Sequence, residues 1–156
     1  MDRLRAVFEE LGFERVSTYI ASGNVIFEAA GRAAELERAI EAKLEETLGF
    51  EVITFLRREN EVRHTASEKP FGKVPAGKTH MVAFLRRRPT ATKRKAIEER
   101  STPSDRLVVD GREVHWLIEG RMMDSELKPS DWDVLGQPTT TRNTTMLAKL
   151  AEKLDD

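Results

Sequence analysis

Residues 16–27 read Val16-Ser17-Thr18-Tyr19-Ile20-Ala21-Ser22-Gly23-Asn24-Val25-Ile26-Phe27. Both ends of this stretch are rich in β-branched and aromatic residues, which favour strands. Between them, Ser22-Gly23-Asn24 has the composition of a tight turn. The stretch therefore predicts a β-hairpin. Because an isolated hairpin is marginally stable in water, the flanking segments must supply the surface on which it packs.

Amphipathic helices are predicted on both sides of this hairpin. Before it, apolar residues recur at helical spacing: Leu4, Val7, Phe8 and Leu11. After it, a second set repeats every four residues: Leu36, Ile40, Leu44 and Leu48. Gly12 and Gly49 stand where each helix should end. A strand over residues 50–56 is expected to follow.

The order α-β-β-α-β in this first part indicates a split βαβ, ferredoxin-like unit that lacks its first strand. That strand is internal in such a sheet, so its absence would leave ladder groups unpaired. We therefore expect the natural protein to begin upstream of Met1. The alternatives are a natural truncation and a chain shortened by engineering. We also expect that a dimer can form through the unpaired sheet edge.

A similar pattern restarts after residue 78. A polar helix over 57–66 and a loop come first, followed by a strand (80–85), a basic helix (90–100) and a hairpin (107–118) that turns at Asp110-Gly111. A short helix (122–128), a loop (129–138) and a last helix (143–154) complete the chain. The predicted fold is α+β, with ferredoxin-like halves at 1–57 and 79–156 joined by a connecting helix and loop at 58–78.

Composition excludes several classes of protein. The chain has no cysteine, so disulfides and cysteine-based zinc sites are ruled out. Its 26 basic and 27 acidic residues give a net charge of −1, which provides no general attraction to nucleic acid or anionic lipid. The longest apolar run, residues 81–85, is far shorter than the roughly 20 residues of a membrane span. We expect a soluble, cytoplasmic protein that does not enter membranes.

One stretch matches the sequence pattern of a phosphate-binding loop but lacks the secondary structure that such a loop needs on either side. Gly72-Lys73-Val74-Pro75-Ala76-Gly77-Lys78-Thr79 fits G-x-x-x-x-G-K-[ST]. A working loop needs a strand before it and a helix starting at Lys78-Thr79. Here a polar segment precedes it and a β-type run follows, so we interpret it as an ordinary connection.

Nucleic-acid binding is an alternative that we do not favour. Arg86-Arg87-Arg88 and Lys93-Arg94-Lys95 form a local basic cluster, and ferredoxin-like sheets can stack RNA bases on aromatic residues. However, Tyr19 and Phe27 fit equally well in a hairpin core, and Glu98 and Glu99 offset the cluster. A solvated helix face explains the same residues.

The strongest candidate site is Thr140-Thr141-Arg142-Asn143, where hydroxyls, a guanidinium and helix-start amides come together, as anion binding requires. In the structural alternative, Thr141 or Asn143 caps the last helix while Arg142 pairs with an acidic residue or with a carbonyl of the other half. With Ser22, Gly23 and Asn24, residues 140–143 form the predicted ligand-binding surface. No spacing of the three histidines suggests a metal, and no catalytic set or cofactor is predicted.

Three runs together resemble the bacterial family called domain of unknown function 1697: Gly12-Phe13, residues 19–27, and residues 140–143. The resemblance spans the chain and implies an α+β fold with ferredoxin-like halves and no established activity. Members usually open with a strand and a glycine-rich turn, which do not precede Met1 here. They also carry a large apolar residue where this chain has Thr144.

The function predicted from these patterns is non-catalytic binding of a small anionic ligand or a protein partner. Two alternatives stay open: a nucleic-acid-binding module, and an enzyme that acts on a phosphorylated substrate through Arg142.

Overall fold

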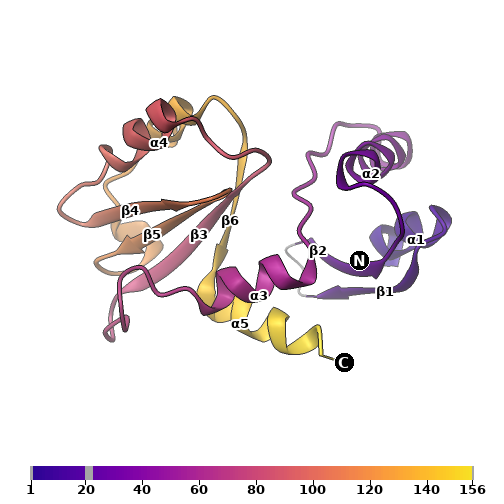
Figure 1. The fold of residues 1–156 in the computed structure, drawn as a ribbon, viewed down its shortest axis with the longest axis horizontal. Helices are drawn as coiled ribbons and strands as arrows, with labels where there is room; N and C mark the ends of the chain where they lie inside the picture. Colours follow the sequence, from indigo (N-terminus) through magenta and orange to yellow (C-terminus); the bar gives the residue numbers. More distant parts are fainter. Residues whose placement is uncertain (1, 20–22, 156) are drawn as a thin grey trace. The chain divides into compact units, whose positions relative to one another are not determined.

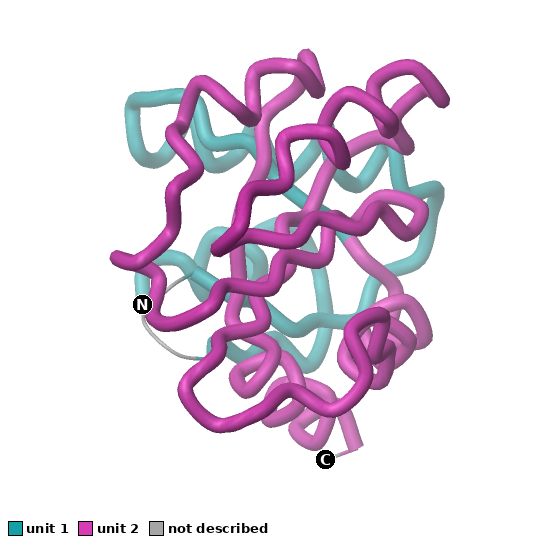
Figure 2. The backbone as a smooth tube through the Cα atoms, turned by 90° about the vertical axis from the view of Figure 1, so that its left-hand side faces the viewer, with its two compact units in different colours: residues 1–56 teal, residues 57–156 magenta. Residues whose placement is uncertain are grey.

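The computed structural model describes residues 2–19 and 23–155. The chain divides into two compact units, Met1–Leu56 and Arg57–Asp156, coloured separately in Figure 2. Each unit has its own sheet and its own apolar core. The chain is therefore an α+β protein with two separate sheets.

Unit 1 is a hairpin packed on two helices. Its elements are α1 (Asp2–Glu10), β1 (Glu14–Tyr19), β2 (Asn24–Glu28) and α2 (Ala33–Leu48). The strands pair antiparallel, with Tyr19 opposite Asn24. The buried core comprises Val7, Phe8, Val16, Ile40 and Leu44. The predicted helices and hairpin of this unit are confirmed, and α2 ends at Gly49 in the left-handed conformation.

The strand predicted at residues 50–56 is wrong. This segment has no regular secondary structure and pairs with neither strand of unit 1. Phe50 and Ile53, which a buried strand would cover, are exposed. Thr54 N–H donates to Glu41 Oε2 at 2.7 Å, so this backbone N–H is satisfied by a side chain on α2 and not by the carbonyl of a neighbouring strand.

Unit 2 is built on a four-stranded sheet (Figure 1). In chain order, its elements are α3 (Glu59–Ser67), β3 (Thr79–Leu85), α4 (Ala91–Glu98), β4 (Asp105–Asp110), β5 (Glu113–Ile118), two 3₁₀ helices, η1 (Met122–Asp124) and η2 (Pro129–Leu135), then β6 (Thr139–Asn143) and α5 (Thr144–Lys153). The strand order is β4-β5-β3-β6, and all neighbours are antiparallel. The β4–β5 hairpin turns at Gly111, whose φ of 61° favours glycine.

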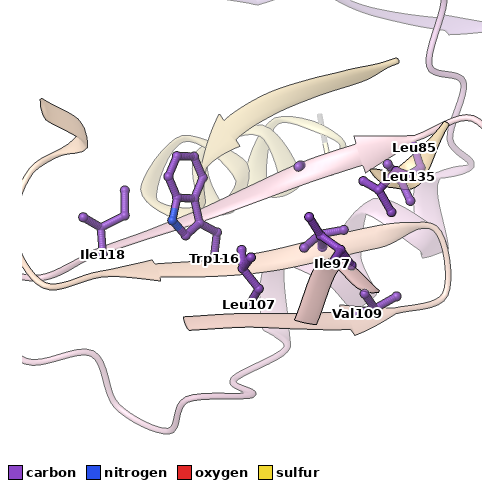
Figure 3. Close-up of a cluster of buried hydrophobic side chains, with 9 residues drawn as sticks. Leu85, Ile97, Leu107, Val109, Trp116, Ile118 and Leu135 are labelled. Carbon is purple, nitrogen blue, oxygen red and sulfur yellow. The ribbon is translucent and has the colours of Figure 1, made fainter. Parts of the chain in front are cut away.

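Helices cover both faces of this sheet (Figure 1). On one face, Ile97 of α4 and Leu135 of η2 pack on alternate residues of β3, β4 and β5, among them Trp116 (Figure 3). On the other face lie α3 and α5. There Arg57, just before α3, forms a buried ion pair with Glu113 of β5, 2.9 Å from Nε to Oε2.

The C-terminal third departs from the sequence prediction at three places. Residues 140–142, predicted as the approach to a helix, form the edge strand β6, in which Arg142 lies opposite Val82. Thr140 and Thr141 are β-branched and suit a strand, but the pairing partner lies about 60 positions away. The short helix predicted at 122–128 is only one 3₁₀ turn, and the loop predicted at 129–138 contains η2.

None of the described helices has both the length and the apolar character needed to cross a bilayer.

Candidate functional site

A pocket in unit 2 lies between the start of α4 and the β4–β5 turn. Its volume is about 370 Å³, and its lining residues are Arg88, Pro89, Ala91, Arg94, Val109, Asp110 and Gly111. Pockets for small molecules usually measure about 300 to 1,000 Å³. The space is therefore sufficient for a small ligand.

Two arginines make this pocket cationic. Arg88 lies in the connection from β3 to α4, and its Nη2 is 3.9 Å from the place that a Cβ on Gly111 would occupy. Within the described part of the chain, Arg88 has no ion-pair partner. Arg94 Nε lies 3.9 Å from Glu98 Oε1, at the limit of an ion pair between partly exposed groups. Both guanidinium groups can therefore turn to a ligand.

The start of α4 adds a favourable backbone. Thr90 caps the helix by accepting a hydrogen bond from Lys93 N–H at 3.2 Å, and Ala91 in the first turn lines the pocket. N–H groups of a first helical turn lack intrahelical acceptors and carry partial positive charge. Together with the arginines, they suit an anion such as a phosphate.

Asp110 is the carboxylate among the residues that line this pocket. Its Oδ2 lies 3.1 Å from Nε2 of His64 on α3, so one oxygen of this carboxylate is already in contact with a histidine. His64 Nδ1 in turn lies 3.5 Å from Glu68 Oε1.

Two buried histidines meet on the α3 side of the sheet. His80 Nε2 lies 2.9 Å from His115 Nδ1, and the His80 and Phe71 rings meet in a T-shaped arrangement with centroids 5.2 Å apart. Burial, with the neighbouring His115, lowers the pKa of His80 to about 4. Burial also lowers the pKa of His115. Both rings are therefore neutral at pH 7, and neither is poised as a general acid.

The predicted site residues fall in different units. Ser22 lies outside the described residues. Gly23 has a φ of 85°, which favours glycine, and Asn24 Nδ2 donates to Tyr19 O at 3.1 Å. Residues 140–143 lie on β6 of unit 2.

The predicted site residues on β6 have structural contacts. Arg142 Nη1 donates to Thr140 Oγ1 at 2.8 Å and to Thr141 O at 2.9 Å, and burial lowers the pKa of its guanidinium. Asn143 caps α5 by accepting from Thr145 N–H at 2.8 Å, which confirms the predicted capping role. Thr144 donates to His80 O at 3.0 Å.

The stretch from Gly72 to Thr79 is a connection that leads into β3, as predicted. Thr79 begins that strand, so no helix starts at Lys78-Thr79. Thr79 Oγ1 donates to Gly120 O and Lys78 Nζ contacts Glu119 Oε1, both within unit 2.

The sequence places Arg88 and Arg94 in one basic cluster, but it does not predict the pocket that they line, because Asp110 and Gly111 on the other side of that pocket come from a distant turn. The grouping of the histidines was missed. The histidines are far apart in sequence, but His80 and His115 lie at strand positions that share one sheet face.

The comparisons with known proteins give a family and a fold. A family model described as "Protein of unknown function (DUF1697)" matches residues 1–115. No curated protein matches the chain significantly. The solved structure of conserved bacterial protein SP0830 from Streptococcus pneumoniae is similar, with a TM-score of 0.76 and 20% identity, over 100% of this chain and 89% of that one. At this identity the likeness shows the fold alone.

Proposed function

Because this chain belongs to the DUF1697 family, whose function is unknown, we propose from geometry that it binds a small anionic ligand in the pocket between α4 and the β4–β5 turn. One observation carries the proposal: Arg88 and Arg94 line a pocket of about 370 Å³ at a helix start, and Arg88 has no ion pair in the described part of the chain. A guanidinium without an ion-pair partner is suited to bind a carboxylate or phosphate.

Titration calorimetry with pyrophosphate tests this proposal. Arg88→Ala and Arg94→Ala should each weaken binding about tenfold or more, because a hydrogen bond to a charged group contributes about 1.5 to 3 kcal/mol. Lys95→Ala is the matched control, since Lys95 is exposed on the same helix and pairs with Glu99 at 3.8 Å. Equal losses in all three variants, or no binding by the wild type, would contradict the proposal.

Nucleic acid is the second candidate, favoured by the basic runs 86–88 and 93–95 that flank this pocket. The salt dependence of binding separates the two candidates. An RNA that contacts many phosphates should lose affinity steeply with salt, because each contact releases counterions. A small ligand held by two arginines should depend on salt much less.

The surface predicted from sequence is a further proposed ligand site. Half-buried Arg142, with Thr140 and Thr141 beside it, supports this view for β6, and Gly23 and Asn24 supply a turn in unit 1. We favour the pocket because the guanidinium of Arg142 already donates to two oxygens of its own strand.

We also propose that the half at 79–156 is ferredoxin-like, with 58–78 connecting it to the half at 1–57, whose described residues form only the α-β-β-α part of such a unit. The strand order β4-β5-β3-β6, with α4 between β3 and β4 and α5 after β6, supports this topology for the second half. A cytoplasmic location and a dimer formed through a sheet edge stay predictions. Light scattering on the purified protein would test the dimer.

A further inference from the structure

Three potential metal ligands converge where the end of α3 meets β4. They are His64 on α3, Glu68 directly after it, and Asp110 at the end of β4, and one ligand atom from each lies within 4.8 Å of the other two. Their side chains are 56%, 40% and 44% exposed, so small rotations can bring the ligand atoms closer together. Imidazole nitrogen and carboxylate oxygen are ligands that Zn²⁺ accepts.

A fourth potential ligand is buried on the same sheet face. His115 is 1% exposed, and within residues 2–19 and 23–155 its Nε2 has no hydrogen-bond partner. Val108 of β4 lies opposite His115, which makes Asp110, two residues further along, its diagonal neighbour on that face. A buried polar atom without a partner is costly, which requires an explanation.

The neighbouring charges and the contact at Nδ1 fit a ligand role for His115. Its burial lowers the pKa, while Asp110 and Glu68 raise it and His64 lowers it, so the three other ligands are also its electrostatic neighbours. His115 Nδ1 is occupied by His80 Nε2 at 2.9 Å. In metal sites, the second ring nitrogen of a ligating histidine is commonly held in this way, which leaves the other nitrogen directed to the ion.

We propose that His64, Glu68, Asp110 and His115 form a binding site for a divalent transition-metal ion of the Zn²⁺ class. Two imidazoles and two carboxylates give the four ligands of a closed tetrahedral site, with the ion about 2.0 to 2.2 Å from each ligand atom. His80 is a positioning residue that fixes the orientation of the His115 ring. The site goes beyond the anion pocket, since only Asp110 is common to both.

Zn²⁺ titration calorimetry on the full chain, purified without a polyhistidine tag, measures the site. The wild type should bind one Zn²⁺ per chain, and His64→Ala and Glu68→Gln should each weaken binding by about tenfold or more. Both substituted residues are partly exposed, so the variants should fold. Glu59→Gln is the control, because Glu59 is a carboxylate on the same helix that pairs with Arg63 outside the cluster.

Nitrogen-15 NMR of the histidine rings tests the buried ligand, and three histidines make the assignment simple. In the wild type, Zn²⁺ should shift the ring nitrogens of His64 and the Nε2 of His115. In His64→Ala, the same Zn²⁺ concentration should not shift the Nε2 of His115. Absence of binding, unchanged affinity in His64→Ala, or a shift of His64 alone would overturn the four-residue site. Pyrophosphate affinity measured on the same variants keeps the two proposals apart, because neither His64 nor Glu68 lines the anion pocket.

Discussion

The carboxylate of Asp105 is fully buried, yet it is charged. Its two oxygens accept hydrogen bonds from the side chains of Trp116, Ser125, Thr102 and Ser104 and from the N–H of Glu126, at 2.6 to 2.9 Å. Burial alone would raise the pKa of Asp105, but these bonds outweigh it and hold the pKa at about 2. One residue thus ties β4 to β5 and to the segment after η1.

Asp105→Asn should lower the free energy of unfolding at pH 7 by about 1 to 3 kcal/mol, because an amide nitrogen replaces one acceptor oxygen and leaves buried donors unpaired. The folded pKa lies below the unfolded value, so the charged form stabilises the fold above about pH 4 and this contribution is lost as pH falls towards 2. The difference between wild type and variant should therefore narrow in acid. Urea unfolding at several pH values measures it.

Asp133→Asn is the control, since Asp133 is exposed. A variant of Asp105 as stable as the wild type at pH 7, or a difference that grows in acid, would contradict the role assigned to this carboxylate.

Individual residues were the hardest feature to predict from sequence. The turn glycines and helix caps were predictable, because they depend on a few neighbouring positions. The His80–His115 contact and the hydrogen bonds of Asp105 depend on which strands pair and in what register. No local pattern contains that information.

At the scale of elements, prediction succeeded where the pattern was long. The periodic apolar residues of α1 and α2 and the β-rich runs on either side of Asp110-Gly111 gave the correct elements. Residues 50–56 are apolar and β-rich but found no ladder partner. Residues 139–143 are polar and threonine-rich, yet they pair with β3 along the sheet edge. Whether each segment became a strand depended on whether another strand lay beside it to pair with. That is a property of the tertiary structure, which local sequence does not determine.

The edge strand β6 supports a prediction about Arg142. If its contacts with Thr140 and Thr141 are structural, Arg142→Ala should lower the free energy of unfolding by about 1 to 3 kcal/mol through lost hydrogen bonds, while pyrophosphate affinity stays unchanged. Arg142→Lys should restore part of the stability, because an ammonium can still donate. Thermal unfolding and calorimetry on both variants measure this.

The reverse pattern would change the assignment of the site. If Arg142→Ala keeps full stability but loses the anion, and Arg142→Lys also binds weakly, then β6 is the ligand surface and the α4 pocket is not.

At the scale of the whole molecule, the two units have separate cores and separate sheets. All the residues that line the anion pocket, and all four proposed metal ligands, belong to unit 2. The proposed functions therefore depend on this unit's own fold. The α+β class could be predicted from the sequence, whereas the pocket could not, because it arises only when the β3–α4 connection meets the β4–β5 turn.

Backbone NMR of the full chain, titrated with pyrophosphate, tests the anion pocket most directly. We expect the largest amide shifts to cluster at Arg88, Ala91, Arg94 and Gly111, on both segments that form the pocket, and to disappear in Arg88→Ala. Shifts centred on residues 140–143, shifts spread over unrelated exposed lysines and arginines, or no shifts at all would contradict it.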